Sequence, residues 1–314
     1  MCYATQQNWK DIQTFLPRNL HLTADHMPRE EWWNWQGHRI HLDTFRDPKA
    51  PVKVILLHGV GTNGRQMTTI LGAPLAKMGF ECVASDMPGY GVTQVRPGAL
   101  VTYDDWVRAG SALIDAEIAH DSRPIMLFGL SAGGMLTYHV AALNRKVKGI
   151  VGMTFLDQRV AHVRRMTALH PAVARGIPLI HLAARIPLLR KLEVPMRLVS
   201  RMHALVNDKA ALKACLRDKS SAGSWVSLKF LSSYMSYRPA IEPDRFDVCP
   251  ILLTQPAADR WTPLQLSDPV LTRIRHVPTR VVMLDQAGHY PLEEPGLTQM
   301  QQAVAEFARA CAKA

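Results

Sequence analysis

The sequence predicts an α/β fold in which helices flank a mostly parallel central sheet and a helical segment is inserted after the sixth strand. Three observations carry this prediction. Apolar, β-branched runs alternate with helical segments over residues 31–155, which is typical of a parallel sheet covered on both faces. The alternation stops over residues 158–245 and resumes at Ile251. The 314 residues are 47% hydrophobic and 20% charged, a balance typical of a protein with a sizeable core.

Composition and turn signals predict the first elements. The aromatic-rich segment that starts near Glu31 indicates two strands joined at Gln36–Gly37. The apolar run Val52–Leu57 has the character of a buried strand and ends in a glycine-rich loop. We expect a helix over residues 64–78 and a further strand over residues 81–85.

Capping and periodicity predict the next elements. Thr102 and Asp105 have the spacing of a capping box, so a helix is expected to begin there and run to about His120. The remaining elements of this half are a strand at 125–128, a helix at 132–144 and a strand at 149–155.

The segment 158–245 interrupts this alternation. Its apolar residues recur at helical spacing, prolines divide it, and we find no convincing strand in it. The later elements are strands at 251–255 and 280–284 and a helix at 297–313. The predicted organisation is a core in two parts, residues 1–157 and 246–314, with residues 158–245 as a helical cap between them.

The clearest chemical signal lies between the strand at 125–128 and the helix at 132–144. Gly129-Leu-Ser131-Ala-Gly133 is a G-x-S-x-G sequence. A sharp turn from strand to helix lifts the serine hydroxyl clear of the sheet, and small flanking residues permit the tight backbone. The helix also directs its N-terminal N–H groups toward developing negative charge. Ser131 is therefore predicted to be a nucleophile.

Loops after three other strands supply candidate partners. His58-Gly59-Val60 follows the strand that ends at Leu57 and can direct a backbone N–H toward an oxyanion. His289 follows the strand at 280–284 and is the predicted general base. Asp259 follows the strand at 251–255, lies 30 residues before His289, and is the predicted acid of a triad.

The order Ser131, Asp259, His289 resembles the α/β-hydrolase superfamily, which carries nucleophile, acid and histidine in this order. The turn Asp86-Met-Pro88-Gly89-Tyr-Gly91 after the fourth strand is similar to that family's turn at the same place. The likeness runs from about Glu31 to the C-terminus, and the insertion lies where these enzymes carry a lid or cap. The capped esterase and monoacylglycerol-lipase-like branch is the most similar one.

The resemblance implies roles for further residues. The backbone N–H groups of Val60 and Ala132 would form an oxyanion hole. Some relatives take the triad acid from the end of an earlier strand, so Asp157 remains an alternative to Asp259. The residues that would brace the loops beneath the site are His58, Gly59 and Asp86.

We therefore expect a serine hydrolase that cleaves a carboxylic ester with a medium or long acyl chain through an acyl-enzyme intermediate. The expected partner is a small-molecule ester, and the mechanism requires no cofactor and no metal. Two alternatives remain open. One is another serine α/β-hydrolase, such as a carbon–carbon bond hydrolase, thioesterase, perhydrolase or peptidase. The other is a non-catalytic, ligand-binding member of the fold.

The charge is strongly positive, with 37 Lys and Arg against 26 Asp and Glu and a net charge of +11. Such an excess fits a nucleic acid, a membrane surface, an anionic substrate, or a basic surface that serves solubility. We expect no nucleic-acid partner, because the sequence lacks basic clusters interleaved with aromatic residues. The arginines and apolar residues of segment 158–245 leave two interpretations. Its helices either pack on the core with solvated arginines or lie in an anionic lipid–water interface.

The location is expected to be cytoplasmic. The sequence has no apolar run long enough to span a bilayer, and its first residues lack the basic region followed by an apolar stretch that is typical of a secretory signal. Its five cysteines are odd in number and lack a CxxC pair, which favours reduced thiols over a disulfide framework or a zinc site.

Overall fold

The computed structural model describes residues 2–313. The strands of the central sheet are β1 (Arg29–Trp35), β2 (His38–Phe45), β3 (Lys53–Leu57), β4 (Glu81–Ser85), β5 (Ile125–Gly129), β6 (Gly149–Gly152), β9 (Ile251–Pro256) and β10 (Thr279–Leu284). The helices around the sheet are α1 (Asn8–Gln13), α2 (Gly64–Met67), α3 (Ala73–Lys77), α4 (Tyr103–His120), α5 (Ala132–Asn144), α12 (Asp268–Leu271) and α13 (Gly296–Lys313). The elements between β6 and β9 are α6 (Ala161–Thr167), α7 (Pro171–Arg175), α8 (Ile177–Ala183), β7 (Glu193–Pro195), α9 (Met196–Val199), α10 (Lys209–Arg217), β8 (Trp225–Ser227) and α11 (Leu228–Ser236).

The sheet has eight strands in the order β1-β2-β4-β3-β5-β6-β9-β10. β1 pairs with β2, and β2 with β4, in antiparallel register, whereas the other neighbours pair in parallel. Every residue of β3, β4, β5 and β6 is buried, which explains why these strands are continuous apolar runs. The predicted mostly parallel sheet is confirmed.

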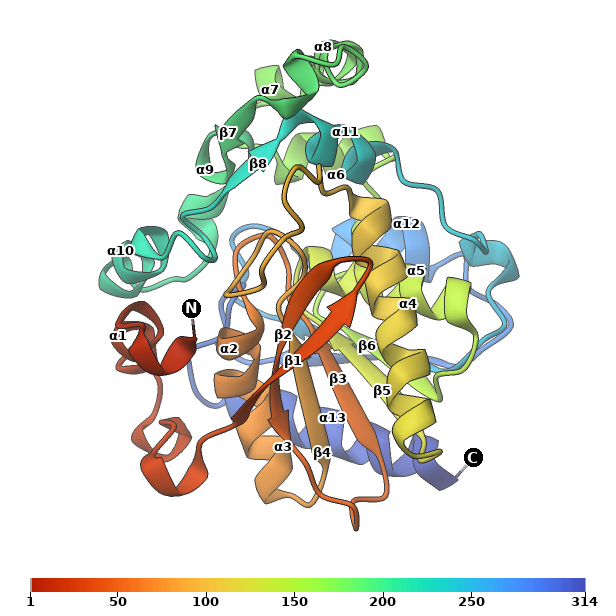
Figure 1. Cartoon of the computed structure of the whole chain (residues 1–314). Coiled ribbons are helices and arrows are strands. Elements are labelled where there is room, and N and C mark those ends of the chain that lie inside the picture. Colours follow the sequence, from red (N-terminus) through yellow and green to blue (C-terminus); the bar gives the residue numbers. More distant parts are fainter. Residues whose placement is uncertain (1, 314) are drawn as a thin grey trace.

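Helices cover both faces of this sheet (Figure 1). α4 and α5 contact each other, and α5 packs on β5 and β6, whereas α13 contacts α3, β9 and β10. The capping box at the start of α4 forms as predicted, with Thr102 accepting from the Asp105 N–H. A π-helical turn, Thr68–Gly72, joins α2 to α3, so the helix expected over 64–78 is continuous but irregular.

Two predictions about the elements are wrong. β6 ends at Gly152 and not near Phe155, because residues 154–155 leave the sheet to bond other loops. Thr154 Oγ1 donates to the Ser131 carbonyl, and the Phe155 N–H donates to Ser267 Oγ. The segment 158–245 also contains a strand pair, β7 with β8. These strands have three residues each, too few for an alternating pattern to be recognised in the sequence.

The elements α7, α8, α9 and α11 lie together at one end of the sheet, above the core (Figure 1). α11 contacts both α8 and α4, and α10 contacts α1 of the N-terminal segment. This arrangement supports the division that we propose, with residues 158–245 as a cap on a core made of residues 1–157 and 246–314.

A buried ionic cluster ties the N-terminal segment to the sheet. Tyr3 Oη donates to both carboxylate oxygens of Asp86, at 2.9 and 3.0 Å. His41 is fully buried and lies 3.1 Å from both Glu30 and Asp86. Burial alone would lower the pKa of His41, but its contacts with Asp86 and Glu30 prevail and raise it to about 9. His41 is therefore a cation in the folded protein at neutral pH.

We expect this cluster to make stability depend on pH. Because the folded pKa of His41 lies above its ordinary value of 6.5, its stabilising effect is complete below pH 6.5 and is lost as the pH rises through about 9. The contribution of protonated His41 to the free energy of unfolding amounts to about 3 kcal/mol. Urea unfolding of the wild type and of His41→Gln should give a difference in stability that shrinks by about this amount between neutral pH and pH values above the folded pKa. A difference that does not change with pH would contradict the prediction.

Candidate active site

Ser131 lies at the turn from β5 to α5. Its backbone has φ 58° and ψ −126°, a strained conformation for a residue other than glycine, and such strain gathers at functional sites. A Cβ on Gly133 would lie 2.2 Å from the Leu57 carbonyl oxygen, so glycine is required for α5 to begin this close to β3. The strand–turn–helix context that the G-x-S-x-G sequence demands is present.

The loop after β3 lies against this turn. A Cβ on Gly59 would lie 2.6 Å from the Leu130 carbonyl oxygen and 2.9 Å from Ser131 Cβ, so a side chain there would displace the serine. Val60, Ala132 and Ser131 line one cavity. Within residues 2–313, neither the Val60 nor the Ala132 N–H donates to a backbone carbonyl. Both amides remain available to an oxygen atom bound in the cavity.

His58 and Asp86 hold the neighbouring loops in place. His58 Nε2 accepts from the Met87 N–H at 2.9 Å, and its Nδ1 donates to the Gly59 carbonyl at 2.8 Å. Asp86 accepts from the N–H of Gly64 at 2.7 Å. Both side chains are fully buried. These contacts support the bracing role that we propose for His58, Gly59 and Asp86.

His289 and Asp259 form a buried pair. His289 Nδ1 lies 2.9 Å from Asp259 Oδ2, and each side chain is only 1% exposed. Thr262 holds the acid, because its N–H and hydroxyl donate to the two carboxylate oxygens at 2.9 and 2.7 Å. Burial raises the pKa of Asp259, but the neighbouring His289 and these hydrogen bonds prevail and lower it to about 2. Asp259 is therefore ionised at neutral pH.

Asp157, the alternative acid, has a different partner. Its carboxylate forms hydrogen bonds with the Arg159 guanidinium at 2.8 to 3.2 Å. Arg159 also binds Glu242 at 2.6 Å. Burial raises the pKa of Asp157, and the Arg159 contacts more than offset this and lower it. This geometry favours Asp259 over Asp157 as the partner of His289.

The second ring nitrogen of His289, Nε2, is buried and lacks a hydrogen-bond partner among residues 2–313. The ring packs against Trp261 with 4.7 Å between centroids, which limits its orientation. No hydrogen bond joins this nitrogen to Ser131 in the described part of the chain. Bonds between a nucleophile and its base often tighten only in the substrate complex.

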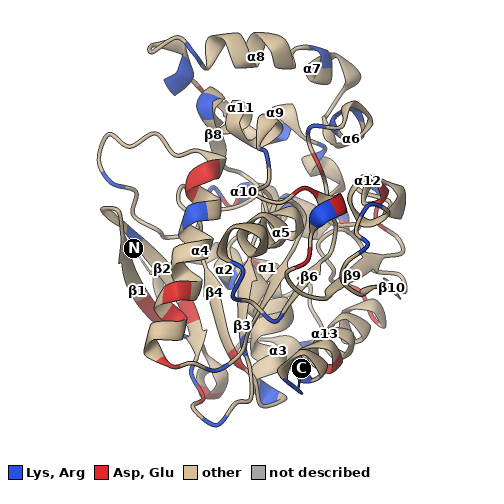
Figure 2. Cartoon of the chain, turned by 90° about the vertical axis from the view of Figure 1, so that its right-hand side faces the viewer, with Lys and Arg blue, Asp and Glu red and all other residues tan. Residues whose placement is uncertain are grey.

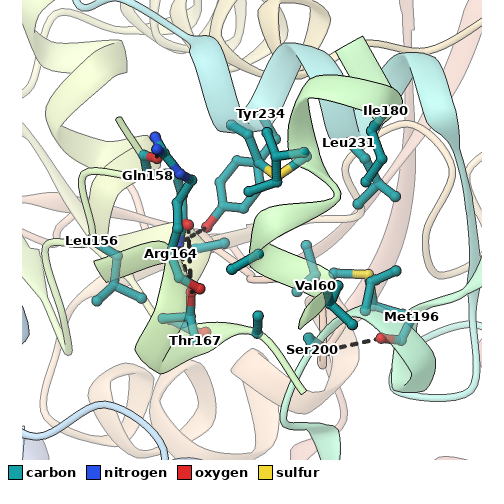
Figure 3. A pocket seen from close by; sticks show the side chains of 18 of the residues that line it. Val60, Leu156, Gln158, Arg164, Thr167, Ile180, Met196, Ser200, Leu231 and Tyr234 are labelled. Carbon is teal, nitrogen blue, oxygen red and sulfur yellow. Dashed lines mark hydrogen bonds between the residues drawn. The ribbon is translucent and has the colours of Figure 1, made fainter. Parts of the chain in front are cut away.

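The cavity beside Ser131 is apolar, and the cap provides most of its wall. Helices α6, α7, α8, α9 and α11 all contribute side chains, and Trp261 adds an aromatic wall. Figure 3 shows the apolar side chains of Ile180, Leu231 and Met196 facing the polar groups of Gln158 and Tyr234 across the cavity.

A model of the alpha/beta hydrolase family matches residues 54–307, more than three quarters of the chain. The chain belongs to the alpha/beta hydrolase family. The match contains Ser131, Asp259 and His289 and also runs through the cap. The α/β-hydrolase fold expected from the sequence is confirmed.

Among sequence relatives, this α/β-hydrolase is similar to protein phosphatase methylesterase 1 from Bos taurus, with 30% identity over 119 residues. The match covers 37% of this chain and 31% of that protein. The Mus musculus protein of the same name gives 29% identity over 119 residues, covering 37% and 30% of the two chains. The aligned region is thus about a third of the length of these curated relatives.

Among solved structures, this α/β-hydrolase is similar to a soluble variant of monoglyceride lipase from Saccharomyces cerevisiae in complex with a substrate analog. The TM-score is 0.74 at 14% identity, covering 94% of this chain and 98% of that one. The monoacylglycerol lipase from Paleococcus ferrophilus gives a TM-score of 0.66 at 20% identity, covering 87% and 99%. These TM-scores establish the shared fold. Together with the family match, they show that this chain has the α/β-hydrolase fold that these lipases share.

Sequence reasoning did not identify two residues that shape this α/β-hydrolase site. Thr262 fixes Asp259, and Trp261 packs on His289 while lining the cavity. Asp259 accepts a hydrogen bond from the backbone N–H of Thr262, three residues later. This spacing is a local signal that the sequence does contain. The contact between Trp261 and His289 depends on the fold and has no local signal.

Within residues 2–313, every helix is too short or too polar to cross a bilayer.

Proposed function

We propose that this α/β-hydrolase is a serine enzyme that cleaves carboxylic esters with medium or long acyl chains. The observation that carries the proposal is Ser131 at a strained turn, lining an apolar cavity together with two available amides. The His289–Asp259 pair supports it, since a buried imidazole held by an ionised carboxylate is the activating device of serine hydrolases.

In the proposed mechanism, Ser131 Oγ attacks the ester carbonyl and His289 Nε2 accepts its proton. This role gives a function to the buried nitrogen that has no partner among the described residues. Asp259 bonds Nδ1, fixes the imidazole tautomer and stabilises the imidazolium. His289 then protonates the leaving alcohol and activates a water molecule, which hydrolyses the acyl-enzyme.

The N–H groups of Val60 and Ala132 would stabilise the oxyanion of the tetrahedral intermediate. One such donor typically contributes about 3–4 kcal/mol to transition-state stabilisation. Because both are backbone groups held by the crowded contact between the loop after β3 and the serine turn, no side-chain reorganisation is needed as charge develops.

The substrate class rests on the wall of the cavity. Its side chains are mainly apolar and come largely from the cap, so an acyl chain would transfer there from water with a gain of about 0.8 kcal/mol per buried methylene. We expect kcat/KM for nitrophenyl esters to rise from acetate to medium-chain acyl groups and then fall once the cavity is filled. A preference for acetate would contradict the proposed chain length, and activity on thioesters or peptides without activity on these esters would contradict the ester proposal.

We further propose that the outer face of the cap contacts anionic lipid surfaces. Eight of the thirteen exposed large hydrophobic side chains in residues 2–313 lie on the cap. They are Leu169, Leu179, Leu182, Ile186, Leu188, Leu192, Leu198 and Trp225. Lys and Arg positions flank α7 and α8 (Figure 2), and Glu193 is the one acidic residue of the sequence between residues 158 and 207. Apolar groups beside cations suit an anionic lipid interface.

Under this proposal, one face of the cap packs on the core and the opposite face contacts lipid. Ile177 is buried at the cavity, whereas Leu179 and Leu188 are 72% and 79% exposed. We expect co-sedimentation with vesicles to increase with anionic lipid content, weaken with salt, and fall when Arg185, Arg190 and Lys191 become Gln.

The matched control for this experiment replaces three exposed lysines of the core, Lys49, Lys148 and Lys313, with Gln. This variant loses the same charge and should bind vesicles almost as the wild type does. Equal sedimentation with neutral and anionic vesicles at low salt, or equal losses in both triple variants, would contradict a docking role for the cap.

A further inference from the structure

A second cavity, separate from the one beside Ser131, lies where the cap meets the loop after β9. Its polar wall consists of Arg201, His203, Asn207, Lys209 and Arg260, of which His203, Lys209 and Arg260 are exposed at the surface. Three of these cationic or ionisable residues come from the cap, and Arg260 comes from the loop that carries Asp259. We call this feature the basic cavity, and we propose that it binds a small anion of the phosphate or carboxylate class.

The cations of the basic cavity are free of acidic partners. Within residues 2–313, none of Arg201, Lys209 and Arg260 takes part in a salt bridge. The adjacent acid, Asp208, turns back on its own helix, where its Oδ1 accepts from the Ala211 N–H at 2.7 Å. A bound anion would supply the counterion that these cations lack.

One further group suits an anion that also carries a hydroxyl or N–H donor. Asn207 Nδ2 donates to the Ala258 carbonyl at 3.2 Å, whereas its Oδ1 is buried with no partner among the described residues. An acidic phosphate or a hydroxyl-bearing ligand would supply the missing donor.

The basic cavity adjoins both loops of the proposed triad. Arg260 follows Asp259 directly, and the Leu205 carbonyl accepts from the Tyr290 N–H, next to His289, at 2.8 Å. Asn207 lies against Gly288, where a Cβ would come within 2.9 Å of Nδ2. An anion held by Arg201 and Arg260 would therefore link the cap to the loop of Asp259. Binding would stabilise this junction, whether or not Ser131 is a nucleophile.

Calorimetry and thermal unfolding with inorganic phosphate test the site. The wild type should bind phosphate and unfold at a higher temperature in its presence. Arg201→Gln and Arg260→Gln should each weaken binding by about tenfold, because each removes one charge-assisted contact. Arg197→Gln is the matched control, since Arg197 is an exposed arginine of the same segment that does not line the cavity. Ser131→Ala should bind phosphate normally, so failure of the proposed function does not affect this result.

A second arm separates a free anion from an anionic group carried on the substrate; this arm alone rests on the proposed function. The nitrophenyl ester of a long-chain fatty acid and the nitrophenyl monoester of the dicarboxylic acid of the same length differ only in the charge at the far end of the acyl chain. For a substrate-borne anion, Arg260→Gln raises KM for the dicarboxylate ester and leaves the fatty acid ester unchanged. For a free anion, Arg260→Gln affects both esters alike. Undetectable phosphate binding, or binding reduced equally in Arg197→Gln, would overturn the proposal.

Discussion

Ser131→Ala is expected to abolish ester hydrolysis, with a loss in kcat of about 10⁶. The alanine removes the proposed nucleophile but keeps the turn, whose φ of 58° is held by contacts around Gly133 and Gly59. The remaining rate would come from binding and the oxyanion hole alone. Rates for a medium-chain nitrophenyl ester, with circular dichroism to verify the fold, measure the effect.

Ser200→Ala is the matched control for this prediction. Ser200 lines the same cavity, but its hydroxyl donates to the Met196 carbonyl at 2.9 Å (Figure 3) and has no part in the proposed chemistry. We expect it to change kcat by less than about tenfold, the scale of one lost hydrogen bond. A folded Ser131→Ala protein that keeps even a tenth of the parent rate would contradict the assignment of the nucleophile.

Asp259→Asn is expected to lower kcat by about 10⁴, because an amide in place of the carboxylate favours the wrong tautomer of His289. Asp259 is the residue in contact with His289 Nδ1, at 2.9 Å. The pKa of about 2 keeps Asp259 ionised, so this carboxylate can stabilise the imidazolium throughout the neutral range.

Asp157→Asn provides the comparison for the acid. It should alter the contacts of Asp157 with Arg159 and leave kcat within about tenfold of the wild type. A larger loss of kcat in Asp157→Asn than in Asp259→Asn would identify Asp157 as the triad acid and would mean that the contact between Asp259 and His289 is structural.

The core could be predicted from the sequence because its signals are local. β3 and β5 are continuous apolar runs since both of their faces are buried, and the Thr102 capping box marks the start of α4. The placement of Ser131, His58 and His289 on loops after strands follows from the same pattern, because parallel strands present their carboxyl ends at one edge.

The cap and the N-terminal segment were harder to predict because their structure depends on distant contacts. β7 and β8 are three-residue strands that pair across about thirty residues of chain. Tyr3 contacts Asp86 across the fold. In the core, the contact of Trp261 with His289 has no local signal for the same reason. Which apolar residues of α8 face the cavity and which face outward also depends on how the cap sits on the core. Periodicity indicates an apolar face but does not identify what covers it.

The central claim is that Ser131 is an activated nucleophile, and covalent labelling tests it most directly. A fluorophosphonate probe reacts with a serine that has an adjacent base and an oxyanion hole, forming a bond from Oγ to phosphorus as fluoride leaves. After digestion, mass spectrometry should place the adduct on Ser131, and labelling should be lost in Ser131→Ala and strongly slowed in His289→Ala. An unlabelled wild-type protein, or an adduct on another residue that persists in Ser131→Ala, would contradict the account.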